Sequence, residues 1–134
     1  MIMGASEGLI EVIVEGPQLV RLRFTGLVDE HDAIKAVAQS AAAVGEQPYA
    51  ILCETPNLKG LTPKARKAFA DGFGKVDLVA VAMIRPSLPT RALSTFVVAA
   101  INILRPKRRM EIAFFDEDDT ARRWATGLLT TGRR

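Results

Sequence analysis

The chain has 134 residues, 49% of them hydrophobic and 25% charged, which is the composition of a single folded domain. Its net charge of +3 is too small to indicate a nucleic-acid-binding domain. The one cysteine cannot form an internal disulfide, and the first residues lack a signal-peptide pattern. The longest apolar stretch, residues 96–104, is less than half as long as a membrane-spanning helix. We therefore expect one cytoplasmic domain over residues 1–134, with its core at about 9–129, that is not transmembrane.

The first predicted elements are two strands rich in β-branched residues, at 9–15 and 19–24. They flank Gly16-Pro17-Gln18, a short turn sequence that predicts an antiparallel hairpin. The second strand alternates, so Arg21 and Arg23 lie on the face opposite to its apolar side chains.

A helix of about four turns is predicted next, with Asp29 as its N-cap and Gly45 as its C-terminal stop. A short apolar strand at 49–54 follows it. A second helix then begins at Thr62 and Pro63, because a hydroxyl cap followed by proline is typical of a helix start.

The most uniformly apolar strand is residues 78–84, which we expect to be central and covered on both faces. A third helix runs from Ser87 or Leu88 to about Leu104, and another strand covers 110–115. The acidic residues 116–119 then begin a last helix with regular apolar spacing. The order β-β-α-β-α-β-α-β-α predicts an α/β domain: a mixed, mostly parallel five-stranded sheet with an N-terminal hairpin and four helices.

Three local motifs accompany this order. They are residues 20–26 before an acidic helix start, the strand 51–54 leading to 60–66, and the aromatic and acidic segment 114–124. Together they resemble the STAS domain of bacterial anti-sigma-factor antagonists, and in particular its SpoIIAA-like, STAS/SEC14-type branch. The resemblance covers the chain from about residue 9 to 129. It implies a STAS-like (SpoIIAA-like) fold and a non-catalytic regulatory domain that binds a protein partner.

The resemblance also implies a phospho-acceptor position at Thr62. In antagonists of this superfamily, an Asp-Ser-Ser-Gly motif at a helix N-terminus carries the serine that a partner kinase phosphorylates. Here Leu61 stands in place of the acid and Pro63 in place of the second serine. The alternative is that Thr62 serves only as the N-cap of its helix, worth about 1 kcal/mol.

Residues suited to catalysis are few. His31 is the only histidine and lies beside two acids in a helix start, and Cys53 lies on an apolar strand without a basic neighbour. A zinc site would need more ligands of these types, and neither glycine-rich phosphate-binding motif occurs. We therefore expect no catalytic residues, no metal and no cofactor, and we expect that the protein is not an enzyme.

The third predicted helix is apolar on more than one face, which is more than a helix covering one side of a sheet needs. Some of Val97, Val98, Ile101 or Ile103 would then be covered by a protein partner, a second subunit or a lipid-like ligand. The alternative is a broad buried face in a tightly wrapped small domain.

A basic turn follows this helix, with Arg105, Lys107, Arg108 and Arg109 close together. Cations at a helix C-terminus are favourable for local reasons alone. Beside an apolar helix they would also suit anionic lipid headgroups.

Two functions follow from these surfaces. The first is the docking of a protein partner through the sheet edge, the third helix or the loop from Glu54 to Thr62, with Asn57 and Lys59 as further contact residues. The alternative is a module that binds a hydrophobic ligand or a membrane surface through the helix 88–104 and the turn 105–109. A homodimer is compatible with either, because an apolar helix can pair with its symmetry mate.

Overall fold

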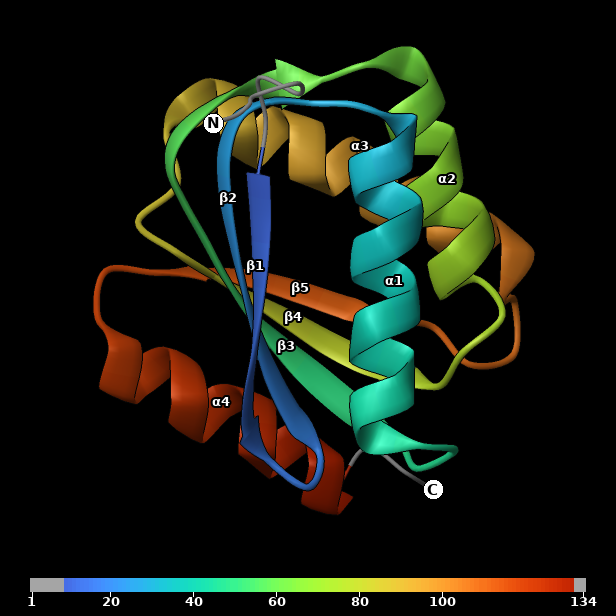
Figure 1. Cartoon of the computed structure of the whole chain (residues 1–134). Coiled ribbons are helices and arrows are strands. Elements are labelled where there is room, and N and C mark those ends of the chain that lie inside the picture. Colours follow the sequence, from blue (N-terminus) through green and yellow to red (C-terminus); the bar gives the residue numbers. More distant parts are fainter. Residues whose placement is uncertain (1–8, 132–134) are drawn as a thin grey trace.

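The computed structural model describes residues 9–131. Its strands are β1 (Leu9–Gly16), β2 (Leu19–Val28), β3 (Tyr49–Leu61), β4 (Leu78–Ile84) and β5 (Glu111–Phe115). Its helices are α1 (Glu30–Val44), α2 (Pro63–Phe73), α3 (Leu88–Leu104) and α4 (Asp118–Thr131), as Figure 1 shows. The predicted order of elements is therefore confirmed.

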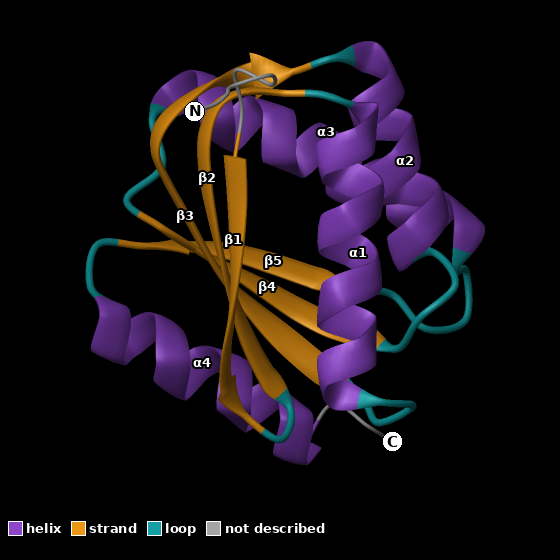
Figure 2. Cartoon of the chain, in the orientation of Figure 1, coloured by secondary structure: helices purple, strands orange, loops and turns teal. Residues whose placement is uncertain are grey.

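The strands form one sheet in the order β1-β2-β3-β4-β5. The hairpin pair β1 and β2 is antiparallel, and every other neighbouring pair is parallel. Figure 2 shows α4 on one side of the sheet and the three other helices on the opposite side. The predicted mixed sheet with its N-terminal hairpin is thus confirmed.

The two faces of the sheet carry separate cores. The larger core packs β2, β3 and β4 against α1, α2 and α3, and it holds Val20, Leu22 and Phe24 of β2. The smaller core lies under α4, where small side chains such as Ala80 and Ala82 let the helix approach the sheet. The prediction that both faces of residues 78–84 are covered is confirmed.

Three of the predicted helix starts, Asp29, Thr62 and Ser87, are N-caps in the structure. Asp29 and Asp32 form a reciprocal capping box, in which each side chain accepts a hydrogen bond from the other residue's backbone N–H. Thr62 accepts from the N–H of Ala65 at 3.1 Å, and Ser87 begins α3 in the same way. These caps hold the three helices that cover the larger core.

Strand β3 is longer than the sequence predicts, since it continues beyond Glu54 to Leu61. The extension pairs with residues 25–28 of β2 through two register shifts. One shift lies beside Gly26, whose φ of 72° is unfavourable for other residues. Because Pro56, Asn57 and Gly60 weaken the strand pattern, sequence periodicity alone ends the strand too early.

The two arginines of β2, Arg21 and Arg23, form ion pairs and are not simply exposed to solvent. The side chain of Arg21 is only 8% exposed, and it lies among Glu15, Glu54 and Asp118. Its guanidinium donates to Glu15 at 2.9 Å and pairs with Asp118 at 2.7 Å. Arg122 of α4 also pairs with Glu15. This cluster joins the hairpin, the central strand and α4 on the side of the sheet that α4 covers.

A second polar contact fixes the end of α3. Asn102 is buried, donates from Nδ2 to the carbonyl oxygen of Met110 at 3.0 Å and accepts the N–H of Met110 at 2.7 Å. The backbone N–H and carbonyl oxygen of Met110, just before β5, are therefore both hydrogen-bonded to the side chain of Asn102.

Replacing Arg21 tests the charged cluster. We expect Arg21→Met to lower the free energy of unfolding at pH 7 by about 3–5 kcal/mol, because it leaves carboxylates without their buried partner. Arg123→Met, on an exposed position of α4, is the matched control and should change it by less than about 0.5 kcal/mol. Equal urea denaturation curves for the two variants would contradict the assignment.

The same cluster predicts a pH dependence. The hydrogen bond from Arg21 is the main cause that holds the pKa of Glu15 below its ordinary value of 4.5. A carboxylate with a lowered pKa in the folded state stabilises the protein above that ordinary value, and the stability is lost as the pH falls through the folded pKa. The free energy of unfolding should therefore fall below about pH 4.5, and Glu15→Gln should make this fall shallower.

The Asn102 contact is tested by truncation. Asn102→Ala should lower the free energy of unfolding by about 2–4 kcal/mol, because it leaves two buried backbone groups of Met110 unpaired. Asn57→Ala, at an exposed asparagine of β3, should leave the thermal and urea transitions nearly unchanged. If both variants behaved alike, the contact would be unimportant for stability.

Candidate functional site

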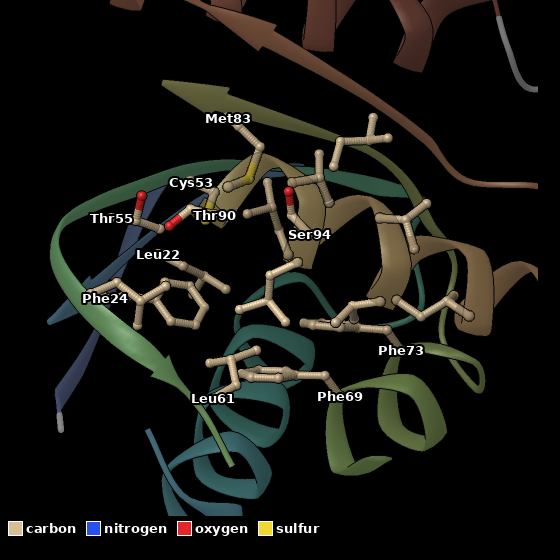
Figure 3. A pocket seen from close by; sticks show the side chains of 18 of the residues that line it. Leu22, Phe24, Cys53, Thr55, Leu61, Phe69, Phe73, Met83, Thr90 and Ser94 are labelled. Atoms are coloured by element: carbon tan, nitrogen blue, oxygen red, sulfur yellow. The ribbon is translucent and has the colours of Figure 1, made fainter. Parts of the chain in front are cut away.

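An apolar cavity of about 90 Å³ lies between the sheet, α2 and α3 (Figure 3). Its wall brings together side chains from six elements that are far apart in the sequence. They are Leu22, Phe24, Ile51, Cys53, Thr55, Leu58, Leu61, Phe69, Phe73, Val81, Met83, Thr90, Leu93, Ser94, Val97, Val98, Ile101, Met110 and Ile112. The cavity is thus part of the larger core and contains no charged side chain among its lining residues.

The cavity exists because β3 and β4 separate. Their pairing ends at Glu54 and Ile84, and β3 continues to Leu61 with β2 alone. In Figure 1 this two-stranded extension curves over the first half of α3. Only side chains span the distance between the extension and the helix, and they leave part of it unfilled.

One side of the wall reaches the surface. Leu58 and Leu61 on β3 and Leu93, Ser94 and Val97 on α3 are partly exposed, although they line the cavity. A small molecule would therefore enter between the β3 extension and α3.

Three hydroxyl groups lie in the otherwise apolar wall. Thr90 bonds Ser87 at 3.0 Å, and Ser94 donates to the carbonyl oxygen of Arg91 at 3.1 Å. The buried Oγ1 of Thr55 has no hydrogen-bond partner among the described residues. Figure 3 shows Thr55 and Thr90 at one end of the cavity and Ser94 nearer its middle. None of the three hydroxyl oxygens is exposed to the cavity, because apolar atoms form its entire surface.

Cys53 also lines the cavity. Burial raises the pKa of its thiol to about 12, and the charge of Glu54 acts in the same direction. The thiol is therefore protonated at neutral pH, and it is a weakly polar part of an apolar wall.

Three residues predicted to contact a partner belong to this wall. Val98 and Ile101 are buried, and Val97 is partly buried against the larger core. Their burial does not fit contact with a protein partner at the surface, and it agrees with the alternative of a broad buried face in a small domain. Helix α3 packs them toward the sheet and points other apolar residues outward, which the all-round apolar sequence did not distinguish.

Two charged residues predicted to contact a partner instead bind other residues of this chain. Glu54 pairs with both Arg21 and Arg23. Arg105 is 8% exposed, donates to the carbonyl oxygen of Leu78 at 2.6 Å and lies 3.7 Å from Asp77. Neither charge is available to a partner, so these predictions are corrected.

The remaining candidates lie on the surface at separate places. Asn57 and Lys59 are exposed on the β3 extension. Lys107, Arg108 and Arg109 are exposed after α3, and Arg108 pairs with Asp77. The basic turn therefore presents fewer free cations than its sequence suggests.

Thr62 is the N-cap of α2 in the structure, as the capping alternative predicts. Its hydroxyl oxygen accepts the N–H of Ala65. Leu61 lines the cavity, so the residue in place of the expected acid serves the apolar wall.

No group of three or more His, Cys, Asp or Glu side chains within residues 9–131 is placed to hold a metal ion. No helix among these residues is both long and apolar enough to cross a membrane.

Several residues of the cavity were not predicted from the sequence. Thr90 and Ser94 are four residues apart on α3 and share its inward face, which is a signal that a helical projection could have found. Thr55 and Leu58 had no such signal, because they lie in the extension of β3 that the sequence pattern does not show.

Comparison with solved structures gives the fold. An uncharacterized protein of the DUF3478 family from Shewanella loihica PV-4, with a SpoIIAA-like fold, is similar with a TM-score of 0.62 at 18% identity. The similarity covers 93% of this chain and 98% of that one. The phosphorylated form of the Bacillus cell fate determinant SpoIIAA is similar with a TM-score of 0.47 at 13% identity, over 86% of this chain and 98% of that chain.

None of the curated protein sequences matches the chain. Residues 20–128 match the family described as "Domain of unknown function (DUF7793)". That match covers most of the chain. It includes every helix and strand from β2 to α4, except the first residue of β2 and the last three residues of α4. The chain therefore belongs to the DUF7793 family, and it has the SpoIIAA-like α/β fold that its sequence predicts.

Proposed function

We propose that this chain is a non-catalytic binding domain that takes a small apolar molecule into the cavity beneath α3. The observation that carries the proposal is the cavity of about 90 Å³, whose surface is formed by apolar atoms alone. The sequence predicts two functions, partner docking and ligand binding. The geometry favours ligand binding, because Val97, Val98 and Ile101 of α3 line the cavity.

The size and lining of the cavity define the ligand. Protein interiors pack nearly as densely as organic crystals, and voids much larger than a water molecule are few. A wall of Leu, Ile, Val, Phe and Met side chains does not hold water well, and apolar cavities of about 150 Å³ take up benzene or xenon. The cavity here is smaller, so it suits a short alkyl group or a compact ring. The affinity for such a ligand would come from apolar contacts with the wall, because no polar atom of the protein lies on the cavity surface.

Binding of a protein partner remains the second candidate function. The observation in its favour is that Leu88, Phe96, Ile103 and Leu104 of α3 are large apolar side chains and are exposed. Single exposed apolar residues are common, but several along one helix indicate a docking surface. A domain could use the inner face of α3 for a ligand and its outer face for a partner.

Methyl-detected NMR titration tests ligand binding. With 1-butanol as the probe, we expect saturable shifts of the methyl signals of cavity residues such as Ile51, Val97 and Met83. Ser94→Leu should abolish them by filling the cavity, whereas Thr126→Leu, at an exposed position of α4, is the matched control and should retain them. Shifts that are unsaturable, or that are the same in Ser94→Leu, would overturn the proposal.

A further inference from the structure

The sulfur-bearing side chains gather at the cavity. Within residues 9–131 they are Cys53, Met83 and Met110, and all three line it. Cys53 of β3 and Met83 of β4 are register partners in a parallel pair, so they lie next to each other on one face of the sheet. Sulfur is polarisable, and the thioether of methionine makes favourable contacts with the edges of aromatic rings. The sheet therefore contributes sulfur atoms to the cavity wall.

Three phenylalanine rings form another part of the wall. Phe69 and Phe73 are four residues apart on α2, so they lie on one face of that helix. Their ring centroids are 5.9 Å apart, and their planes differ by only 7°. Phe24 of β2 continues the row, with its ring centroid 5.8 Å from that of Phe69 and an angle of 50° between the planes. The wall thus carries a continuous row of aromatic rings.

The sulfur atoms and the rings lie on opposite sides of the cavity. Figure 3 shows Cys53 and Met83 on one side and Phe69 and Phe73 on the other. Aromatic rings attract one another at centroid separations of about 4.5–7 Å, beyond the effect of the area they bury. The two ring pairs of the wall already have separations in this range. An aromatic ring in the cavity would therefore gain contacts on both sides, whereas a saturated ring would gain burial alone.

The polarity of the wall and its open side define the ligand further. No charged side chain lines the cavity, and apolar atoms alone form its surface. A charged group placed there would lose its hydration without gaining a partner. The wall residues Leu58, Leu61 and Leu93 are partly exposed, so a polar substituent on the ring would have to extend past them to solvent.

We infer that the cavity selects an aromatic ring with no charged group at its buried end, held between the sulfur atoms of the sheet and the phenylalanine rings. This inference rests on the proposed function, because it names the chemical class of the ligand for the same cavity. Burial of apolar area alone predicts the opposite preference between six-carbon rings, because cyclohexane has a larger apolar surface than benzene. A preference for benzene would therefore come from the cavity wall and not from hydrophobicity.

Paired NMR titrations of the full chain with benzene and cyclohexane test this selectivity. We expect benzene to bind about tenfold more tightly, and to show intermolecular NOEs to the ring protons of Phe69 and the methyl group of Met83. If cyclohexane bound as tightly as benzene, the inference would be overturned and the proposed function would stand, because a small apolar molecule would still be bound. If neither probe bound, or if benzene showed NOEs only to Leu58 and Leu61 at the open side, both would be overturned.

A conservative variant separates the chemistry of the wall from the shape of the cavity. Met83→Leu removes the sulfur at nearly constant volume, a change that cores tolerate well, and it should lower the preference for benzene over cyclohexane about threefold. Leu93→Ile, also on the wall, is the matched control and should leave the preference unchanged. A preference that stayed the same in Met83→Leu would show that shape alone selects the ring, and it would overturn the role of the sulfur atoms.

Discussion

Strand β3 extends well beyond the end of its neighbour β4, and this difference in length sets the position of the cavity. Parallel strands of equal length would have paired to their ends and would have been covered closely by α2 and α3. Here β3 follows β2 instead, through register shifts near Gly26 that bend the pair away from β4. The core beneath the extension must then be completed by side chains alone, and it is completed only in part.

Helix α3 closes this space and has two different faces. Its inward residues line the cavity, and large apolar residues on its outward face are exposed. The helix can present both because its ends are held by polar contacts, with Ser87 as the N-cap and Asn102 bound to the backbone of Met110. Arg105 adds a buried hydrogen bond to Leu78 at the start of β4. These contacts fix both ends of the helix relative to the sheet.

The charged cluster of Arg21 fixes the hairpin, β3 and α4 relative to one another on the other side of the sheet. Helix α4 covers β3 and β4 with small and apolar residues, and the neighbouring part of the sheet carries charges. Arg21 neutralises carboxylates from the hairpin, β3 and α4 at once. A buried group of this kind specifies how the hairpin sits relative to α4, although it contributes less net stability than an apolar core of equal size.

Most of the fold could be predicted from the sequence, because its signals are local. The caps at Asp29 and Thr62 and the alternation in β2 each act within a few residues, and the structure confirms them. The candidate site was predicted only in part. The apolar excess of α3 was visible, but which of its residues face inward depends on the sheet beneath it. The burial of Arg105 and Glu54 depends on partners far along the chain, such as Asp77 and Arg21, that no local pattern contains.

Xenon binding in the crystal tests the central claim most directly. Xenon occupies apolar cavities without requiring hydrogen bonds, and its scattering locates it without ambiguity. Crystals pressurised with the gas should show a xenon atom between α3 and the sheet, in contact with residues such as Ile51, Phe69 and Val97. If no xenon bound there, and the side chains of α3 and the β3 extension were found to fill the space, the account of a ligand cavity would be contradicted.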